Sequence, residues 1–296
     1  MPDSPTQLSE ALARVGYLAD TGLATAGFLA MRLGKPVFLE GDAGVGKTAF
    51  AGALAQAYGL ELIRLQCYEG LDAAQAIYDW DFPRQVLHLR ALEAAAAGGG
   101  TPVDAAAAEA SLYDRRFLLA RPLLQAVERA PCVLLVDEVD RADDEFEAYL
   151  LEILADAAIT IPELGRIAAA TPPTVVVTSN RTRDVHDALK RRCLYHWVAH
   201  PDPVREARIL RLRLPEVTER LAMQVATATA QLRELDLVKP PGVAEAIDWA
   251  AALRVLVVDE LTPEAVAASL GVVLKVREDL DRVRELPPTA LLGAGP

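Results

Sequence analysis

The chain has 296 residues, of which 52% are hydrophobic, so it can bury the core of one large domain or of a main and a smaller domain. Its formal net charge of -12 argues against a protein that coats nucleic acid or an anionic membrane. An acidic protein can still hold a phosphate group, because a nest of backbone N–H groups and one lysine suffices.

The amino-terminal stretch has no basic segment followed by an apolar core, and no apolar run has the length of a membrane span. Cys67, Cys132 and Cys193 are far apart and lack CxxC spacing, which disfavours a disulfide framework or a zinc site. The four histidines show no ligand spacing either. We therefore expect a cytoplasmic protein with reduced thiols.

Apolar residues at helical spacing predict helix over residues 8–33. The stretch KPVFLEGDAGVGKT then predicts a short strand, a glycine-rich turn and a helix that stops at Gly59. A second strand is expected over 60–67. The low-complexity stretch AAAAGGGTPVDAAAA predicts a flexible surface loop or an insertion at about residues 94–110.

Further along, a helix at 121–130 leads into CVLLVDEVD, whose apolar run is typical of a strand buried on both faces of a parallel sheet. A helix over 145–156, a β-hairpin over 158–171 and a buried strand over 171–180 are expected next. From residue 204 onward only helical periodicity remains. The sequence thus predicts an α/β nucleotide-binding domain over 1–200, with a parallel sheet flanked by helices, and a small all-helical lid domain over 201–296.

The stretch GDAGVGKT fits the phosphate-loop pattern G-x-x-x-x-G-K-[ST]. Glycines let successive backbone N–H groups face phosphate oxygens, and the helix that follows adds its positive amino-terminal dipole. Lys47 would contact the β- and γ-phosphates of ATP, and the Thr48 hydroxyl would bind Mg²⁺. The alternative is a glycine-rich turn with an exposed lysine. The predicted ATP-binding residues are Gly41, Asp42, Ala43, Gly44, Val45, Gly46, Lys47 and Thr48.

Two polar strand ends supply the other candidates. Asp137 and Glu138 follow the apolar run VLLV, and ligands bind at the carboxyl ends of strands in open parallel sheets. Asp137 would hold Mg²⁺ through the ion's own waters, and Glu138 would act as the general base. Asn180 ends the strand VVVTSN, where its amide can donate to the γ-phosphate; the alternative is an ordinary turn asparagine.

This order of motifs resembles the AAA+ ATPases, with a P-loop AAA+ core followed by a helical lid. Within them, LLVDEVDRAD is similar to the corresponding stretch of the MoxR family, including Arg141 and Ala142. YLAD, LIRLQCYEGLD, YDWDFPRQ, RPLLQA and LKRRC are similar to the CoxD-like branch of that family. The likeness spans roughly residues 15–255. The chain departs from the pattern in two respects. Ala43 stands where a proline is common in the loop, and the lid segment LVKPPGVAEAIDW has no arginine where many AAA+ lids offer one to the nucleotide. Either Lys239 substitutes for that arginine or the contact is absent in this branch.

The resemblance implies ATP hydrolysis with Mg²⁺ by a homo-oligomeric ring, usually a hexamer, that remodels a client. It also implies a partner with a von Willebrand factor A domain and, for this branch, maturation of a metalloenzyme. The alternative is a scaffold that binds ATP with little hydrolysis. The mixed charges of the lid do not predict direct binding to nucleic acid. Tyr78 and Trp80 either pack on the core or line the pore of a ring.

The stretch DALKRRC carries three adjacent cations, Lys190, Arg191 and Arg192. In a monomer they would be a solvated helix end. The resemblance implies instead that one arginine reaches the nucleotide of the neighbouring subunit, as an arginine finger does. Pairing RCLY with the family's RFLF selects Arg192 for this role and leaves Arg191 as the alternative.

Overall fold

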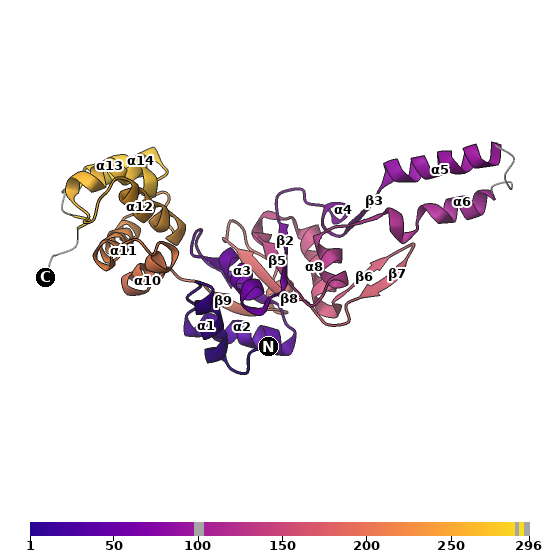
Figure 1. Cartoon of the computed structure of the whole chain (residues 1–296), viewed down its shortest axis with the longest axis horizontal. Helices are drawn as coiled ribbons and strands as arrows, with labels where there is room; N and C mark the ends of the chain where they lie inside the picture. The colour runs from indigo at the N-terminus through magenta and orange to yellow at the C-terminus, as the bar shows by residue number, and fades with distance from the viewer. Residues whose placement is uncertain (98–103, 288–289, 293–296) are drawn as a thin grey trace. The chain divides into compact units, whose positions relative to one another are not determined.

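The computed structural model describes residues 1–97, 104–287 and 290–292 (Figure 1). The chain forms two compact units, each built from several segments. Unit 1 comprises Met1, Ala26–Phe38 and Tyr58–Tyr195, and unit 2 comprises Pro2–Thr25, Leu39–Ala57 and His196–Pro296. The phosphate-loop segment therefore belongs to the same compact unit as the carboxyl-terminal helices. The domain boundary near residue 200 stays a prediction.

A five-stranded sheet has the order β2-β5-β8-β1-β9. Its strands are β1 (Val37–Glu40), β2 (Glu61–Gln66), β5 (Cys132–Asp137), β8 (Thr174–Ser179) and β9 (Leu194–Trp197). β2 pairs with β5 and β5 with β8, in both cases in parallel. All six residues of β5 are buried, as expected for a central strand covered on both faces. The predicted α/β class with a parallel sheet is confirmed. β9 was not predicted.

Helices α7 (Pro122–Glu128) and α8 (Asp144–Asp156) cover the core of unit 1. On α8, Phe146, Leu150 and Ile153 are buried, whereas Tyr149 is 47% exposed. The predicted hairpin is present as β6 (Ala158–Ile161) and β7 (Gly165–Ala168), which pair antiparallel. After β8 a short helix, α9 (Asp187–Lys190), precedes β9.

An insertion between β2 and α7 carries most of the structure that the sequence did not predict. It contains α4 (Ala73–Ala76), β3 (Tyr78–Trp80), α5 (Phe82–Ala97), α6 (Ala105–Leu112), a 3-10 turn η1 (Arg115–Phe117) and β4 (Leu118–Ala120). β3 and β4 pair antiparallel, and two helices extend from them (Figure 1). Of the two interpretations of residues 94–110, the insertion agrees with the structure. The flexible loop is wrong where the stretch is described, because alanine has the highest helix propensity and extends both helices into it. Residues 98–103 of that loop lie outside the described residues.

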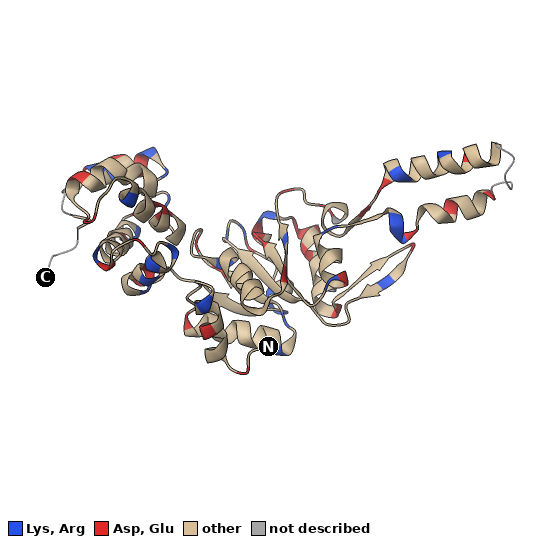
Figure 2. Cartoon of the chain, in the orientation of Figure 1, with Lys and Arg blue, Asp and Glu red and all other residues tan. Residues whose placement is uncertain are grey.

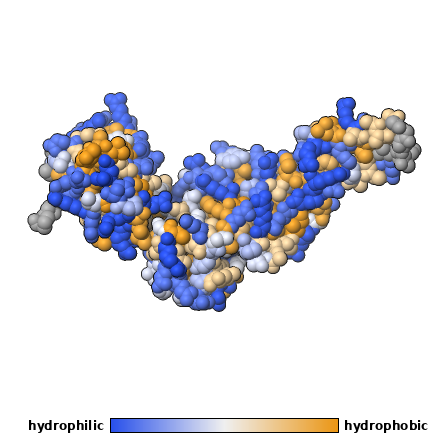
Figure 3. All heavy atoms as spheres, viewed as in Figure 1, coloured by the Kyte–Doolittle hydropathy of each residue, from blue (hydrophilic) through white to orange (hydrophobic). Residues whose placement is uncertain are grey.

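The aromatic residues of β3 pack inside unit 1. Tyr78 and Trp80 lie against its hydrophobic core, and the rings of Trp80 and Tyr113 meet edge to face with centroids 5.4 Å apart. In contrast, α5 exposes Phe82 and Leu87, and apolar side chains are visible on the surface of the α5–α6 hairpin in Figure 3. The core-packing alternative for Tyr78 and Trp80 accounts for these contacts, and a pore role stays a prediction.

The amino-terminal segment forms two helices instead of the one predicted over 8–33. α1 (Pro5–Arg14) begins with Ser4 as its N-cap and a proline at its first position, a common start for a helix. Gly16 has φ 81°, a left-handed conformation that stops the helix, and α2 (Thr21–Leu33) begins after it. α2 starts in unit 2 and continues into unit 1. α3 (Lys47–Tyr58) follows the phosphate-loop segment, as predicted.

The carboxyl-terminal region of unit 2 is all helical. It consists of α10 (Pro203–Arg213), α11 (Glu219–Glu234), α12 (Val243–Val255), α13 (Pro263–Val273) and α14 (Arg277–Arg284). Trp249 is fully buried among these helices, and its indole nitrogen donates to the Ser269 hydroxyl at 2.7 Å. Acidic and basic residues are both scattered along these helices (Figure 2). The predicted helical character of the carboxyl-terminal region is confirmed. Across the described ranges, no helix is long and apolar enough to cross a membrane.

Candidate functional site

In unit 2 the phosphate-loop segment lies between β1 and α3. Lys47 is the first residue of α3 and is buried. Its ammonium donates to the carbonyls of Gly41, at 2.7 Å, and Asp42, at 2.6 Å. A Cβ atom on Gly41 would lie 2.3 Å from the Val198 carbonyl oxygen, so no larger residue fits there. The loop thus wraps around its lysine, as a phosphate loop does.

Tyr17 holds the other end of the loop. Its hydroxyl donates to the Gly46 carbonyl at 3.3 Å, and its ring lies 5.7 Å from that of Phe50 on α3. Burial raises the pKa of Tyr17 well above its ordinary value, so the hydroxyl keeps the proton that it donates at neutral pH. The role of Tyr17 was not predicted from the sequence.

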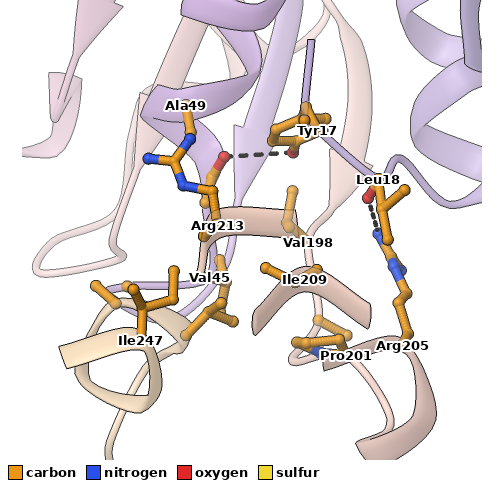
Figure 4. Close-up of a pocket in the computed structure, with 16 residues that line it drawn as sticks. Tyr17, Leu18, Val45, Ala49, Val198, Pro201, Arg205, Ile209, Arg213 and Ile247 are labelled. Atoms are coloured by element: carbon orange, nitrogen blue, oxygen red, sulfur yellow. Dashed lines mark hydrogen bonds between the residues drawn. The ribbon is translucent and has the colours of Figure 1, made fainter. Parts of the chain in front are cut away.

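A cavity of about 210 Å³ adjoins Gly44 and Gly46 (Figure 4). Its apolar lining comes mainly from Val45, Ala49, Val198, Ile209, Val243 and Ile247. Arg205 borders the cavity. One terminal nitrogen of its guanidinium already donates a hydrogen bond to the Leu18 carbonyl, at 2.7 Å. An apolar cavity next to an anion-binding loop suits the base of a nucleotide.

In unit 1 the two acidic residues leave β5 in different environments. Asp137 is 2% exposed; its Oδ1 accepts from the Thr178 hydroxyl at 2.6 Å, and its Oδ2 accepts from the Arg64 guanidinium at 2.6 Å. A carboxylate fixed in this way suits Mg²⁺, which prefers oxygen ligands of well-defined geometry. The contact of Arg64 with Asp137 was not predicted.

Glu138 adopts the left-handed conformation, with φ 56° and ψ 51°, directly after the strand. A non-glycine residue there is uncommon and is often found at functional sites. Its Oε1 accepts from the Asn180 amide at 3.0 Å, and its Oε2 from the Gln66 amide at 3.1 Å. The Arg141 guanidinium also lies 3.1 Å from Oε2. The structure therefore brings together Glu138 and Asn180, the predicted base and the predicted phosphate sensor.

Asp140 connects the strand ends of β5 and β8. It is 2% exposed and accepts hydrogen bonds from the backbone N–H groups of Asn180, at 3.1 Å, and Thr182, at 2.8 Å. Burial alone would raise the pKa of Asp140, but the hydrogen bonds from Thr182 and Asn180 outweigh it, and the pKa is lowered. Asp140 therefore fixes the backbone that carries Asn180.

Replacing Asp140 with alanine is expected to lower the free energy of unfolding by about 3 kcal/mol, because two backbone donors lose their acceptor. Urea unfolding at neutral pH measures the effect. Asp184→Ala removes an exposed carboxylate nearby and serves as the control.

A carboxyl group with a lowered folded pKa stabilises the protein above the unfolded value of 3.8 and ceases to do so as the pH falls through the folded pKa. The difference between wild type and Asp140→Ala should therefore shrink in that acidic range. A constant difference would contradict this role.

The three cations after β8 are not equivalent. The Lys190 ammonium lies over the Phe38 ring, 5.7 Å from its centroid. Arg191 and Arg192 are exposed, and Arg192 donates through Nη1 to the Leu151 carbonyl on α8. Within the described ranges the Arg191 side chain has no polar partner. The sequence did not distinguish these environments.

Some of the site residues that were not predicted do carry a signal in the sequence. Arg64 and Gln66 alternate with buried residues in β2, so both point to the same face of that strand. Polar residues at alternate positions of a strand beside Asp137 and Glu138 are an available signal. Among the described residues, no group of three or more histidine, cysteine or acidic side chains is placed to hold a metal ion.

Residues 36–193 match the sequence family described as AAA domain (dynein-related subfamily). No curated protein matches the chain. Similar solved structures include the Thermotoga maritima RuvB Holliday junction branch migration motor, at 17% identity and a TM-score of 0.48, covering 94% of this chain and 74% of that one. A single-residue variant of that motor gives 16% identity, the same TM-score, and coverage of 94% and 72%.

Proposed function

Because the chain belongs to the AAA domain family, in its dynein-related subfamily, we propose that it binds ATP with Mg²⁺ and hydrolyses it to remodel a client protein. The observation that carries the catalytic part is the Glu138 carboxylate, which the Asn180 amide contacts at 3.0 Å. A base and an adjacent amide are the groups that an attacking water needs.

Unit 2 supplies the groups for binding. The loop N–H groups and the Lys47 ammonium take the phosphates, and the apolar cavity beside Gly44 and Gly46 takes the base. Two residues are candidates to hold Mg²⁺: Thr48, through its hydroxyl, and Asp137, through its carboxylate. The ion would draw charge from the β- and γ-phosphate oxygens when it is bound.

Unit 1 supplies the groups for hydrolysis. Glu138 accepts a proton from the attacking water, and Asn180 orients the γ-phosphate relative to it. Asp140 fixes the backbone of Asn180 by accepting its N–H, and the Thr178 hydroxyl fixes the backbone of Glu138 by accepting its N–H at 2.9 Å. The second candidate function is a scaffold that binds ATP with little hydrolysis, since Gln66, Asn180 and Arg141 occupy both oxygens of Glu138.

The assembly in this proposal is a homo-oligomeric ring, as is common among AAA+ ATPases, and we favour a hexamer. The MoxR-like stretch LLVDEVDRAD and the CoxD-like stretches support a more specific role. This role is the maturation of a metalloenzyme, together with a partner that carries a von Willebrand factor A domain. Copurification of that partner and the client from the source organism would test it.

Replacing Lys47 with alanine is expected to weaken ATP binding about 10²-fold, since charge-assisted contacts to two phosphates are lost. Titration with a fluorescent ATP analogue in the presence of Mg²⁺ measures this, and a phosphate-release assay follows turnover by the wild type. Lys35→Ala, at an exposed position, removes the same charge outside the loop and serves as the control. Wild-type protein that binds no ATP, or a Lys47→Ala variant that binds it equally well, would contradict the proposal.

A further inference from the structure

The first turn of α12 touches the phosphate loop inside unit 2. The backbone N–H of Val243 donates to the Gly44 carbonyl at 2.9 Å. A Cβ atom on Gly242, the N-cap of this helix, would lie 2.7 Å from the Gly44 Cα atom and 3.0 Å from the Ala43 carbonyl oxygen. The two backbones are therefore in direct contact, and the Glu245 carboxylate lies beside both glycines.

The two glycines serve this contact for different reasons. Gly44 has φ +78°, a conformation that other residues rarely adopt. Gly242 has φ -82° and ψ -176°, which any residue can adopt. The backbone conformation therefore does not require glycine at position 242. What requires it is the space, because a Cβ atom closer than 3.0 Å to its neighbour forces one of the two segments to move.

Other side chains hold the connection before α12 in place. Arg233 donates through Nε to the Pro241 carbonyl at 2.8 Å, and both of its terminal nitrogens contact Glu206 at 2.7 Å. Glu206 is fully buried, so this pair is held in one geometry. Glu245 accepts the N–H of Gly242 at 3.0 Å and so fixes the helix start. The lid thus presents a rigid edge to the loop.

The hydrogen bond to Gly44 also sets the direction of the next N–H group. A peptide unit is planar and trans, so the C=O of Gly44 and the N–H of Val45 point in opposite directions. When α12 holds the Gly44 carbonyl on one side, the Val45 N–H is fixed on the other. In a phosphate loop, the N–H groups at such positions bind the anion.

We propose that Gly242 and Val243 position the phosphate loop, so that the lid and the bound nucleotide are coupled through the main chain of Gly44. The proposal rests on the function proposed above and adds two positioning residues to it. It also explains how a lid segment that has no arginine can affect nucleotide binding, through the backbone of the phosphate loop. Opening of the lid would release the Gly44 carbonyl, and nucleotide binding would favour the seated lid by the same free energy.

Gly242→Ala tests the close approach by adding one methyl group. We expect the dissociation constant for Mg²⁺ with a fluorescent ATP analogue to rise about five- to tenfold, the equivalent of one hydrogen bond. Stopped-flow measurement should assign most of the change to faster release. Gly271→Ala, at a helical position with open space around it, is the control and should bind as the wild type does.

Val243→Pro tests the hydrogen bond separately. Proline is well tolerated at the first position of a helix, and the extended conformation of Gly242 is compatible with a following proline. The variant removes the N–H donor and keeps an apolar ring in place of the side chain. Val243→Ala is its matched partner, because it retains the N–H and loses more of the side chain. We expect weaker nucleotide binding in Val243→Pro than in Val243→Ala.

The thermal midpoint of the nucleotide-free variants separates positioning from a general loss of stability. Unchanged midpoints with weakened binding in Gly242→Ala and Val243→Pro support the proposal. Binding equal to that of the wild type in both overturns it, although the proposed function would stand. Should Gly242→Ala fail to fold, the comparison of Val243→Pro with Val243→Ala decides alone. A wild-type protein without nucleotide binding overturns both the positioning role and the proposed function.

Discussion

Replacing Glu138 with glutamine is expected to lower phosphate release about 10³-fold while ATP binding is retained, since general bases contribute about 10²–10⁴ in rate. Glutamine has the size of glutamate and can still accept from Asn180 or Gln66 through its remaining oxygen. It cannot accept a proton from water at neutral pH. The change therefore removes the chemical step and keeps the local packing.

Steady-state phosphate release and a nucleotide titration, performed on the same oligomeric preparation, separate the two effects. Glu145→Gln is the matched control, because it removes an exposed carboxylate from the nearby helix α8. Equal and slow turnover of wild type and Glu138→Gln, with ATP bound by both, would favour the scaffold over the hydrolase. Loss of ATP binding in Glu138→Gln would instead show that the residue acts in binding.

The elements that local sequence determines were predicted well. An apolar run such as VLLV in β5 has few alternatives to a buried strand, and GDAGVGKT combines a strand, a turn and a helix in a short stretch. The hairpin β6–β7 and the buried strand β8 followed from alternating or apolar runs bounded by turn residues. These patterns are sufficient because neighbouring residues carry the information.

The elements that depend on distant residues were missed. β3 and β4 pair across an insertion, so neither strand has a local signal strong enough to identify it. The low complexity and the glycines of the alanine-rich stretch favour a loop or insertion, whereas its alanines favour helix and belong to α5 and α6. At the candidate site, Gln66 contacts Glu138 from a strand 72 positions earlier, and only the pairing of β2 with β5 brings them together.

The second large effect on ATP hydrolysis is expected from replacing Arg192. We expect Arg192→Ala to assemble and to bind ATP, but to lower hydrolysis about 10³-fold, within the range of about 10³–10⁵ for arginine fingers. The Leu151 carbonyl accepts a hydrogen bond from one terminal nitrogen of its guanidinium, and among the residues that the structure describes the other N–H groups have no partner. A guanidinium that is already oriented loses less entropy when it meets a phosphate than a free one does. Arg191, which is exposed and adjacent, provides the matched control as Arg191→Ala.

Mixing experiments test whether the arginine acts on a neighbouring subunit. Arg192→Ala subunits retain Lys47 and can bind ATP, whereas Lys47→Ala subunits retain Arg192 and bind ATP poorly. If the arginine acts in trans, a mixed oligomer contains sites where an intact loop meets an intact arginine, and part of the activity returns. If Arg191→Ala is impaired and Arg192→Ala is not, Arg191 is the residue of DALKRRC that acts in trans. Full activity of both variants would contradict the in-trans role and leave these cations as a solvated helix end, because neither would then stabilise the charge that develops on the γ-phosphoryl group.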